Sequence, residues 1–263
     1  MTIPTLAATG AEINNAAVIV DESTKEKYWA ITKFPKYSIM DPELTLSVPL
    51  KLTIWGAMDI LSHTFEYYFN GNNQSEFQLC FSEALIKTIM KTVEKLNADP
   101  NDIVARGELM WCSVMAWGGL TKIGQGDPDM TCHSIEESFS GYFDTHHGAC
   151  LGILTPNWMK LVTKKAPVEF ARFGKNIFGL SGDDSTVAAE AVIHYFSWLK
   201  SIQAPQEYAD IAKPGQTITC KELETVAETA FSIYHGNIGR LVRFSLEDIN
   251  DLLKAGMIPY SLD

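Results

Sequence analysis

The segment TCHSIEESFSGYFDTHHGACLGILTP, residues 131–156, contains half of the chain's six histidines: His133, His146 and His147. A glycine at position 141 and a polar dipeptide at 144–145 interrupt this segment. Such punctuation predicts a helix, a reversal and a second element. His133 and His147 stand fourteen residues apart, too far to share one face of a short helix. If the segment folds back, it can bring the two imidazoles together.

A second pair of candidate ligands, Asp59 and His63, lies upstream in the segment AMDILSHTFEYY. Apolar residues recur there at helical intervals, and positions i and i+4 of a helix share one face. One carboxylate and three imidazoles, with His133 and His147, suit Fe(II) or Zn(II) and leave a position open for a substrate oxygen. By spacing alone, a D-x-x-x-H pair is weak evidence for a metal site, because helix faces often present such pairs, and a histidine pair after a turn is more often a surface feature.

Composition limits the classes of function. The chain has 263 residues, of which 46% are hydrophobic and 20% charged, enough for a sizeable core. Its formal net charge of −11 argues against nucleic acid or an anionic membrane as a partner. The most apolar stretch, residues 109–120, is shorter than the roughly 20 residues that cross a bilayer. The first ten residues lack the basic and apolar regions of a signal peptide.

The cysteines and the remaining histidines carry weaker signals. Five cysteines, widely spaced and without a C-x-x-C pair, indicate reduced thiols in a cytoplasmic protein. Cys132 and Cys150 flank the candidate ligands, and we expect both to be small buried residues rather than ligands. We expect His194 and His235 to be packing or surface histidines, and His146 to lie beside the site or at the surface.

The fold class predicted from periodicity is mainly α. Nine segments carry apolar residues at i, i+3 and i+4 spacing: 52–68, 76–96, 103–123, 133–142, 149–162, 168–178, 186–201, 220–234 and 246–255. Ser245, followed three residues later by Asp248, marks the start of the last one. Helices joined by short loops indicate a helical bundle over residues 49–263. Residues 1–48 differ, because AAVIVDE and KYWAITK predict a β-hairpin, which is marginally stable by itself.

Four short motifs occur in a characteristic order. They are TLAATGAE at 5–12, DPELT at 41–45, D-x-x-x-H at 59–63, and HSIE at 133–136 with HG at 147–148 and GILTPNWM after it. With these motifs the chain resembles the iron-containing (group III) alcohol dehydrogenases, and most closely their butanol-dehydrogenase-like branch, from residue 5 to about 253. The resemblance implies a dehydroquinate-synthase-like C-terminal helical domain. It assigns the metal ligands as Asp59, His63, His133 and His147.

The resemblance also implies a chemistry. The family interconverts primary alcohols and aldehydes with NAD(P) and a divalent metal, so we expect Fe(II) or Zn(II), NAD(P) and a small alcohol or aldehyde. Thr5, Thr9 and Gly10 would contact the nicotinamide cofactor. From the residues alone, T-x-x-x-T-G could equally be a capping loop before a helix.

The chain departs from the family pattern in three places. Ala11 replaces the usual serine of the TLAATG loop, and Glu137 replaces a histidine that lies near cofactor and substrate in the family. Glu137 therefore puts proton handling or substrate fit in question. The chain also has no G-x-G-x-x-G turn, and its nearest stretch, GQGDPD at 124–129, is acidic and would repel phosphate.

These departures leave alternative hypotheses open. In the first, the chain is the C-terminal part of a metal-dependent alcohol dehydrogenase or aldehyde reductase, and residues 1–48 are the remnant of its cofactor-binding α/β domain. In the second, it is a non-catalytic metal-binding helical fragment, or one half of a split enzyme that assembles with a separate cofactor-domain chain. A helical scaffold with incidental histidines is the third. A homo-oligomer is compatible with each of them.

Overall fold

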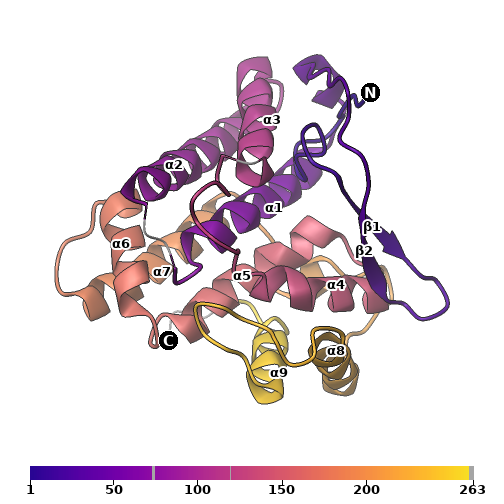
Figure 1. Ribbon diagram of the computed structural model, residues 1–263, viewed down its shortest axis with the longest axis vertical. Helices are drawn as coiled ribbons and strands as arrows, with labels where there is room; N and C mark the ends of the chain where they lie inside the picture. The colour runs from indigo at the N-terminus through magenta and orange to yellow at the C-terminus, as the bar shows by residue number, and fades with distance from the viewer. Residues whose placement is uncertain (73–74, 119, 261–263) are drawn as a thin grey trace. The chain divides into compact units, whose positions relative to one another are not determined.

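The computed structural model describes residues 1–72, 75–118 and 120–260. Within them the chain forms one two-stranded sheet, two short 3-10 helices and nine α-helices (Figure 1). Their bounds, in chain order, are β1 Ala16–Val20, β2 Lys27–Ile31, η1 Pro42–Thr45, α1 Leu50–Tyr68, α2 Glu76–Ala98, α3 Ile103–Trp117, α4 Thr131–Phe143, α5 His147–Val162, α6 Pro167–Phe178, α7 Asp184–Ser201, η2 Tyr208–Asp210, α8 Cys220–Ile233 and α9 Leu246–Ala255. The predicted fold class, mainly α with a short hairpin before the helices, is confirmed.

One predicted helix was too long. The prediction over 103–123 was wrong at its end, because α3 stops at Trp117. Gly118 follows with φ −89° and ψ 70°, outside the helical region, and glycine has poor helix propensity. The hydroxyl of Thr121 donates to the carbonyl oxygen of Ala116 at 2.7 Å and so satisfies one of the last carbonyl groups of the helix.

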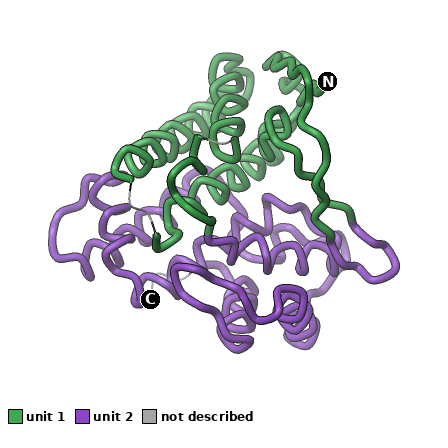
Figure 2. Tube along the Cα trace, in the orientation of Figure 1, with its two compact units in different colours: residues 1–19, 28–128 green, residues 20–27, 129–263 purple. Residues whose placement is uncertain are grey.

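The chain divides into two compact units, coloured separately in Figure 2. Unit 1 comprises residues 1–19 and 28–128, and unit 2 comprises residues 20–27 and 129–263. The units are groups of residues that contact one another. The predicted domains divide the chain differently, into a remnant of a cofactor domain at 1–48 and a helical domain at 49–263. That division stays a prediction.

Unit 1 is built around α1, which packs against α2 and α3. Every residue from Gly56 to Tyr68 is buried, including Asp59, His63 and Glu66. Ionisable side chains are rarely buried without a partner or a function, so their presence on one buried helix marks a candidate site. The N-terminal loop lies directly on this helix, because a Cβ added at Gly56 would clash with the carbonyl oxygen of Ala7.

Unit 2 contains residues 131–156, the segment that carries His133, His146 and His147. Helix α4 packs against α5 and α8, and α5 also packs against α7 and α9. Between α4 and α5 the chain reverses at Asp144, which adopts the left-handed conformation with φ 52°. Gln216 stabilises this reversal, because its side-chain amide donates to the carbonyl oxygen of Phe143 at 2.9 Å. Lys213 forms an ion pair with Asp144.

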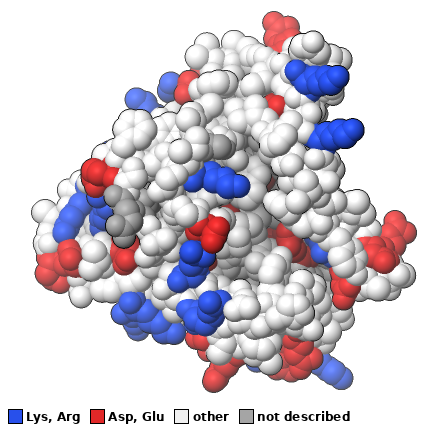
Figure 3. Space-filling view, in the orientation of Figure 1, with Lys and Arg blue, Asp and Glu red and all other residues white. Residues whose placement is uncertain are grey.

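Two surface features bear on partners. None of the helices in the described part of the chain has the length and apolar character needed to cross a membrane. On the face drawn in Figure 3, acidic and basic side chains of the described residues are interspersed.

The hairpin exposes apolar side chains on both of its faces. Val18 and Ile19 are adjacent on β1, so their side chains point to opposite faces, and both are exposed. On β2, Trp29 and Ile31 are 55% and 79% exposed. Strands that are apolar on both faces are typically covered on both sides in folded proteins. The hairpin therefore exposes apolar side chains of a kind that sheets usually bury.

Arg106 provides a test of how unit 1 is held together. Its buried guanidinium donates to the carbonyl oxygens of Thr45, Val48 and Pro100 at 2.5, 3.3 and 2.7 Å. We expect Arg106→Met to lower the free energy of unfolding by about 2–4 kcal/mol, because it leaves these carbonyl groups without their donor. Chemical denaturation followed by circular dichroism measures the change. The control, Arg243→Met, removes an exposed arginine and should cost less than about 0.5 kcal/mol. Equal losses in both variants would contradict the role given to Arg106.

Candidate metal centre

Unit 1 places Asp59 and His63 one turn apart on α1. Both are buried, and the distance from Asp59 Oδ1 to His63 Nε2 is 3.6 Å. Two ligands about 2.1 Å from one tetrahedral ion lie about 3.4 Å apart, so the observed separation suits a shared ion. The His63 ring packs against Trp117 with 4.7 Å between ring centroids, which restricts how the imidazole can turn.

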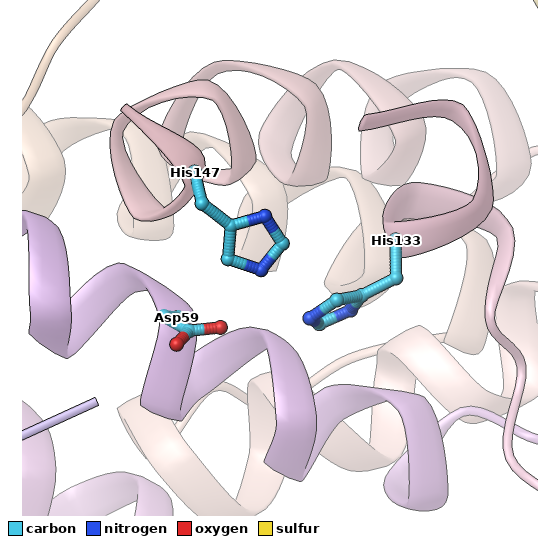
Figure 4. Close-up of side chains that lie close together, drawn as sticks. All are labelled: Asp59, His133 and His147. Carbon is cyan, nitrogen blue, oxygen red and sulfur yellow. The ribbon is translucent and has the colours of Figure 1, made fainter. Parts of the chain in front are cut away.

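Unit 2 places His133 and His147 together. His133 lies in the first turn of α4, and His147 is the first residue of α5, after the reversal. The two rings lie close together, with centroids 5.2 Å apart and ring planes tilted by 53° (Figure 4). The fold-back expected from the glycine and the polar dipeptide thus brings together two imidazoles that are fourteen residues apart in sequence.

Glu136 is the residue that the sequence analysis missed. Its carboxylate is completely buried and hydrogen-bonds to Nδ1 of His147. Burial by itself raises the pKa of a carboxyl group. At Glu136 the charge and hydrogen bond of His147, with help from Lys27 and Ser140, outweigh burial and hold the pKa below its usual range. A carboxylate on Nδ1 leaves Nε2 of His147 available as a ligand, an arrangement found at many metal-binding histidines.

The sequence contained a signal for Glu136. It stands three residues after His133 in the HSIE motif, at a spacing that keeps both on neighbouring parts of one helix face. Its partner His147, however, lies eleven residues further on and across a reversal. Helical periodicity cannot encode such a contact. His146, the other member of the pair, is the half-buried N-cap residue of α5.

Glu137 points to a different neighbour from Glu136. It is half-buried, lies four residues after His133 on α4, and accepts a hydrogen bond of 2.6 Å from the hydroxyl of Tyr234. The i to i+4 spacing places Glu137 on the same side of the helix as His133. A carboxylate and a phenol are therefore joined near a candidate ligand.

The TLAATG loop is a tight turn in unit 1. Asn14 closes it by donating its side-chain amide to the carbonyl oxygens of Thr9 and Gly10 at 2.9 and 3.0 Å. Gly10 has φ +59°, and a Cβ there would lie 2.7 Å from the carbonyl oxygen of Ser113. The next described element is a β-strand, so the loop does not cap a helix. Thr5 and Thr9 are exposed and accessible to a ligand.

The other residues singled out in the sequence have structural surroundings. His194 is exposed and stacks on Phe178, with ring centroids 5.3 Å apart. His235 is exposed and has φ 51°. The acidic stretch ends at Asp129, whose buried carboxylate accepts hydrogen bonds from the backbone amides of Arg240 and Leu241 at 2.8 and 2.7 Å. Asp129 therefore anchors a loop next to the start of α4.

Comparison with known proteins identifies the family. Residues 53–257 match the C-terminal model of the Fe-containing alcohol dehydrogenase family. The chain belongs to the iron-containing alcohol dehydrogenase family. The match covers all four candidate ligands, which lie on the helices α1, α4 and α5.

Relatives of this alcohol dehydrogenase family chain include butanol dehydrogenases. It is 34% identical over 257 residues to NADH-dependent butanol dehydrogenase A of Clostridium acetobutylicum, covering 96% of this chain and 64% of that protein. A probable NADH-dependent butanol dehydrogenase 1 of Bacillus subtilis is 33% identical, with 97% and 65% covered. The crystal structure of NADH-dependent butanol dehydrogenase A from Thermotoga maritima superposes with a TM-score of 0.90 at 35% identity, covering 97% of this chain and 65% of that one. The chain thus spans less than two thirds of the length of these relatives, 64–65%.

The cysteines offer a test of the packing around the candidate ligands. Cys112, Cys132 and Cys150 are buried, whereas Cys80 and Cys220 are exposed. Burial raises the pKa of Cys112 to about 12 and that of Cys150 well above its usual value, so neither thiolate forms near neutral pH.

We therefore expect a chromogenic thiol reagent at pH 8 to titrate two of the five thiols in the folded protein, and all five in denaturant. The double variant Cys80→Ser/Cys220→Ser should show none while folded. Rapid reaction of a third thiol in the native protein would contradict the burial of these side chains.

Proposed function

We propose that this chain provides the metal-binding part of an NAD(P)-linked alcohol dehydrogenase or aldehyde reductase. In this proposal Asp59, His63, His133 and His147 bind one divalent metal ion. The observation that carries it is the family match over residues 53–257, which includes these four side chains. Each unit contributes two of them, already paired within that unit.

The donor set fits such an ion. Asp59, His133 and His147 each offer one ligand atom, a carboxylate oxygen or a ring nitrogen (Figure 4). Imidazole and carboxylate donors suit Fe(II), as the family description indicates, and also Zn(II). Glu136 supports the assignment of His147 rather than His146, because it holds the ring by Nδ1 and leaves Nε2 for the metal.

The substrate class follows from the relatives. Their names include butanol, methanol and 1-propanol dehydrogenases and an NADPH-dependent aldehyde reductase. We propose a small primary alcohol or its aldehyde. A bound metal supplies Lewis acidity toward the substrate oxygen, and the nicotinamide accepts or supplies the hydride. The free thiols fit a reducing cytoplasm as the location.

The side chains of this chain have distinct proposed roles. The four ligands would hold the ion that orients the reacting oxygen. Three of them, Asp59, His63 and His133, are buried, which restricts the access of water. Glu137 and Tyr234, joined by their hydrogen bond, hold a proton near the ligand face of α4. Glu137 is thus the proposed acid–base or substrate-positioning residue, in place of the histidine usual in the family. Thr5, Thr9 and Gly10 form the proposed contact with the nicotinamide cofactor.

A second candidate function has its own observation in favour. The strands β1 and β2 expose apolar side chains on both faces of their hairpin. Such a surface fits a chain that acts only after a separate cofactor-domain polypeptide covers it. In that case the isolated chain binds metal but does not turn over. The two functions share the metal site and differ in where the nicotinamide is bound.

Metal content is the first test. We expect the purified chain to contain about one equivalent of iron or zinc by elemental analysis, because four donors outcompete water for the ion. His63→Ala, His133→Ala and His147→Ala should each lose it. His194→Ala, which removes an exposed histidine, should retain it. Equal metal content in all of these variants would refute the ligand assignment.

Cofactor binding separates the two candidate functions. We expect the chain alone to show no saturable binding of NADH or NADPH below about 1 mM in a fluorescence titration, since it contains no glycine-rich phosphate turn. Adding the part of a butanol dehydrogenase that this chain does not match should produce binding. Micromolar affinity of the chain by itself for NADH or NADPH would contradict this expectation. It would favour complete activity in one polypeptide.

A further inference from the structure

The tip of the hairpin, residues 20–27, belongs to unit 2 and lies on α4. The tip has a defined shape, because the carboxylate of Asp21 accepts hydrogen bonds from the backbone amide and hydroxyl of Ser23 at 2.8 and 2.6 Å. A Cβ added at Gly141 would clash with the carbonyl oxygen of Lys25. The contact between the tip and the helix therefore requires glycine at position 141.

Lys27 connects this tip to the ligand helix. Its half-buried ammonium group donates to Oγ of Ser140 at 2.5 Å. Ser140 in turn donates to the backbone carbonyl oxygen of Glu136 at 2.9 Å, and the Glu136 side chain holds His147. A residue more than a hundred positions upstream is thus linked through two intermediates to a proposed metal ligand.

The charge of Lys27 has a function in this position. Glu136 is completely buried, and a buried carboxylate is costly unless positive charge lies close to it. A histidine that coordinates a metal through Nε2 while donating from Nδ1 is neutral, so His147 in that state contributes a hydrogen bond without a compensating charge. The positive charge of Lys27 acts on the Glu136 carboxylate.

We propose that Lys27 is a positioning residue of the metal centre: through Ser140 and Glu136 it holds the His147 ring in the orientation that binds the ion. The proposal rests on the proposed function, since it assumes that His147 is a ligand. It assigns a role in the metal site to the hairpin tip.

The test is a metal titration of the full chain, stripped of metal and reloaded with Co(II) or Zn(II). We expect Lys27→Met to weaken binding about 10- to 100-fold, the range typical when an outer partner of a ligand is removed. The visible spectrum of bound Co(II), which reports the ligand geometry, should change as well. Lys27→Arg should restore both, because arginine keeps the charge and the donor. Lys25→Met removes an exposed lysine from the same tip and should bind like the wild type.

A double-mutant cycle guards against a general effect on folding. Ser140→Ala removes the link without changing any charge and should also weaken binding, while Lys27→Met/Ser140→Ala should be little weaker than Lys27→Met alone. Strictly additive losses, or wild-type affinity and spectrum in Lys27→Met, would overturn the role of Lys27. Failure of the wild type to bind Co(II) or Zn(II) would instead overturn the proposed metal site, so the two failures are distinguishable.

Discussion

The carboxylate of Glu136 is completely buried beside the imidazole of His147, and much of unit 2 is arranged to make that burial tolerable. Removing an ionised carboxylate from water costs several kcal/mol, which only close partners of suitable charge and geometry can offset. His147, at the start of α5, hydrogen-bonds to the carboxylate, and the charge of Lys27 acts on it from the hairpin tip. Lys27 is itself held by Ser140, whose hydroxyl donates to the backbone carbonyl oxygen of Glu136 on α4. Each of these segments must then be held in place, by the left-handed turn at Asp144 and by the glycine at 141.

The sequence predicts an element well when the interactions that define it lie within a few residues of one another. Helix α9 begins where the sequence predicts, because Ser245 and Asp248 form a reciprocal cap that is complete within four residues. The end of α3 was mispredicted because apolar residues continue in sequence past Trp117, while a hydrogen bond at the end of the helix comes from the hydroxyl of Thr121. Periodicity reports which face of a segment is apolar. It does not report where a tertiary contact ends the helix.

The candidate site likewise contains some residues that the sequence predicts and others that it does not. The positions of the proposed ligands could be read from spacing and motif order, since Asp59 and His63 share a helix face and His133 and His147 flank a reversal. The residues that support these ligands could not be predicted from the sequence. Lys27 meets Ser140 across 113 positions, and Tyr234 meets Glu137 across 97. Such pairs exist only after the helices have packed, so no local pattern in the sequence marks them.

The replacement of the usual histidine by Glu137 changes the electrostatic requirements of the site. Glu136 and Glu137 are adjacent on α4, so this helix carries two neighbouring carboxylates close to the proposed ligand His133. Like charges in a poorly solvated environment destabilise the packing around them unless positive charge or hydrogen bonds offset them. The two carboxylates have separate partners within unit 2. The hydroxyl of Tyr234 donates to Glu137, whereas His147 and the charge of Lys27 act on Glu136. Each carboxylate is therefore offset by residues that are distant in sequence, and the glutamate at position 137 does not draw on the partners of Glu136.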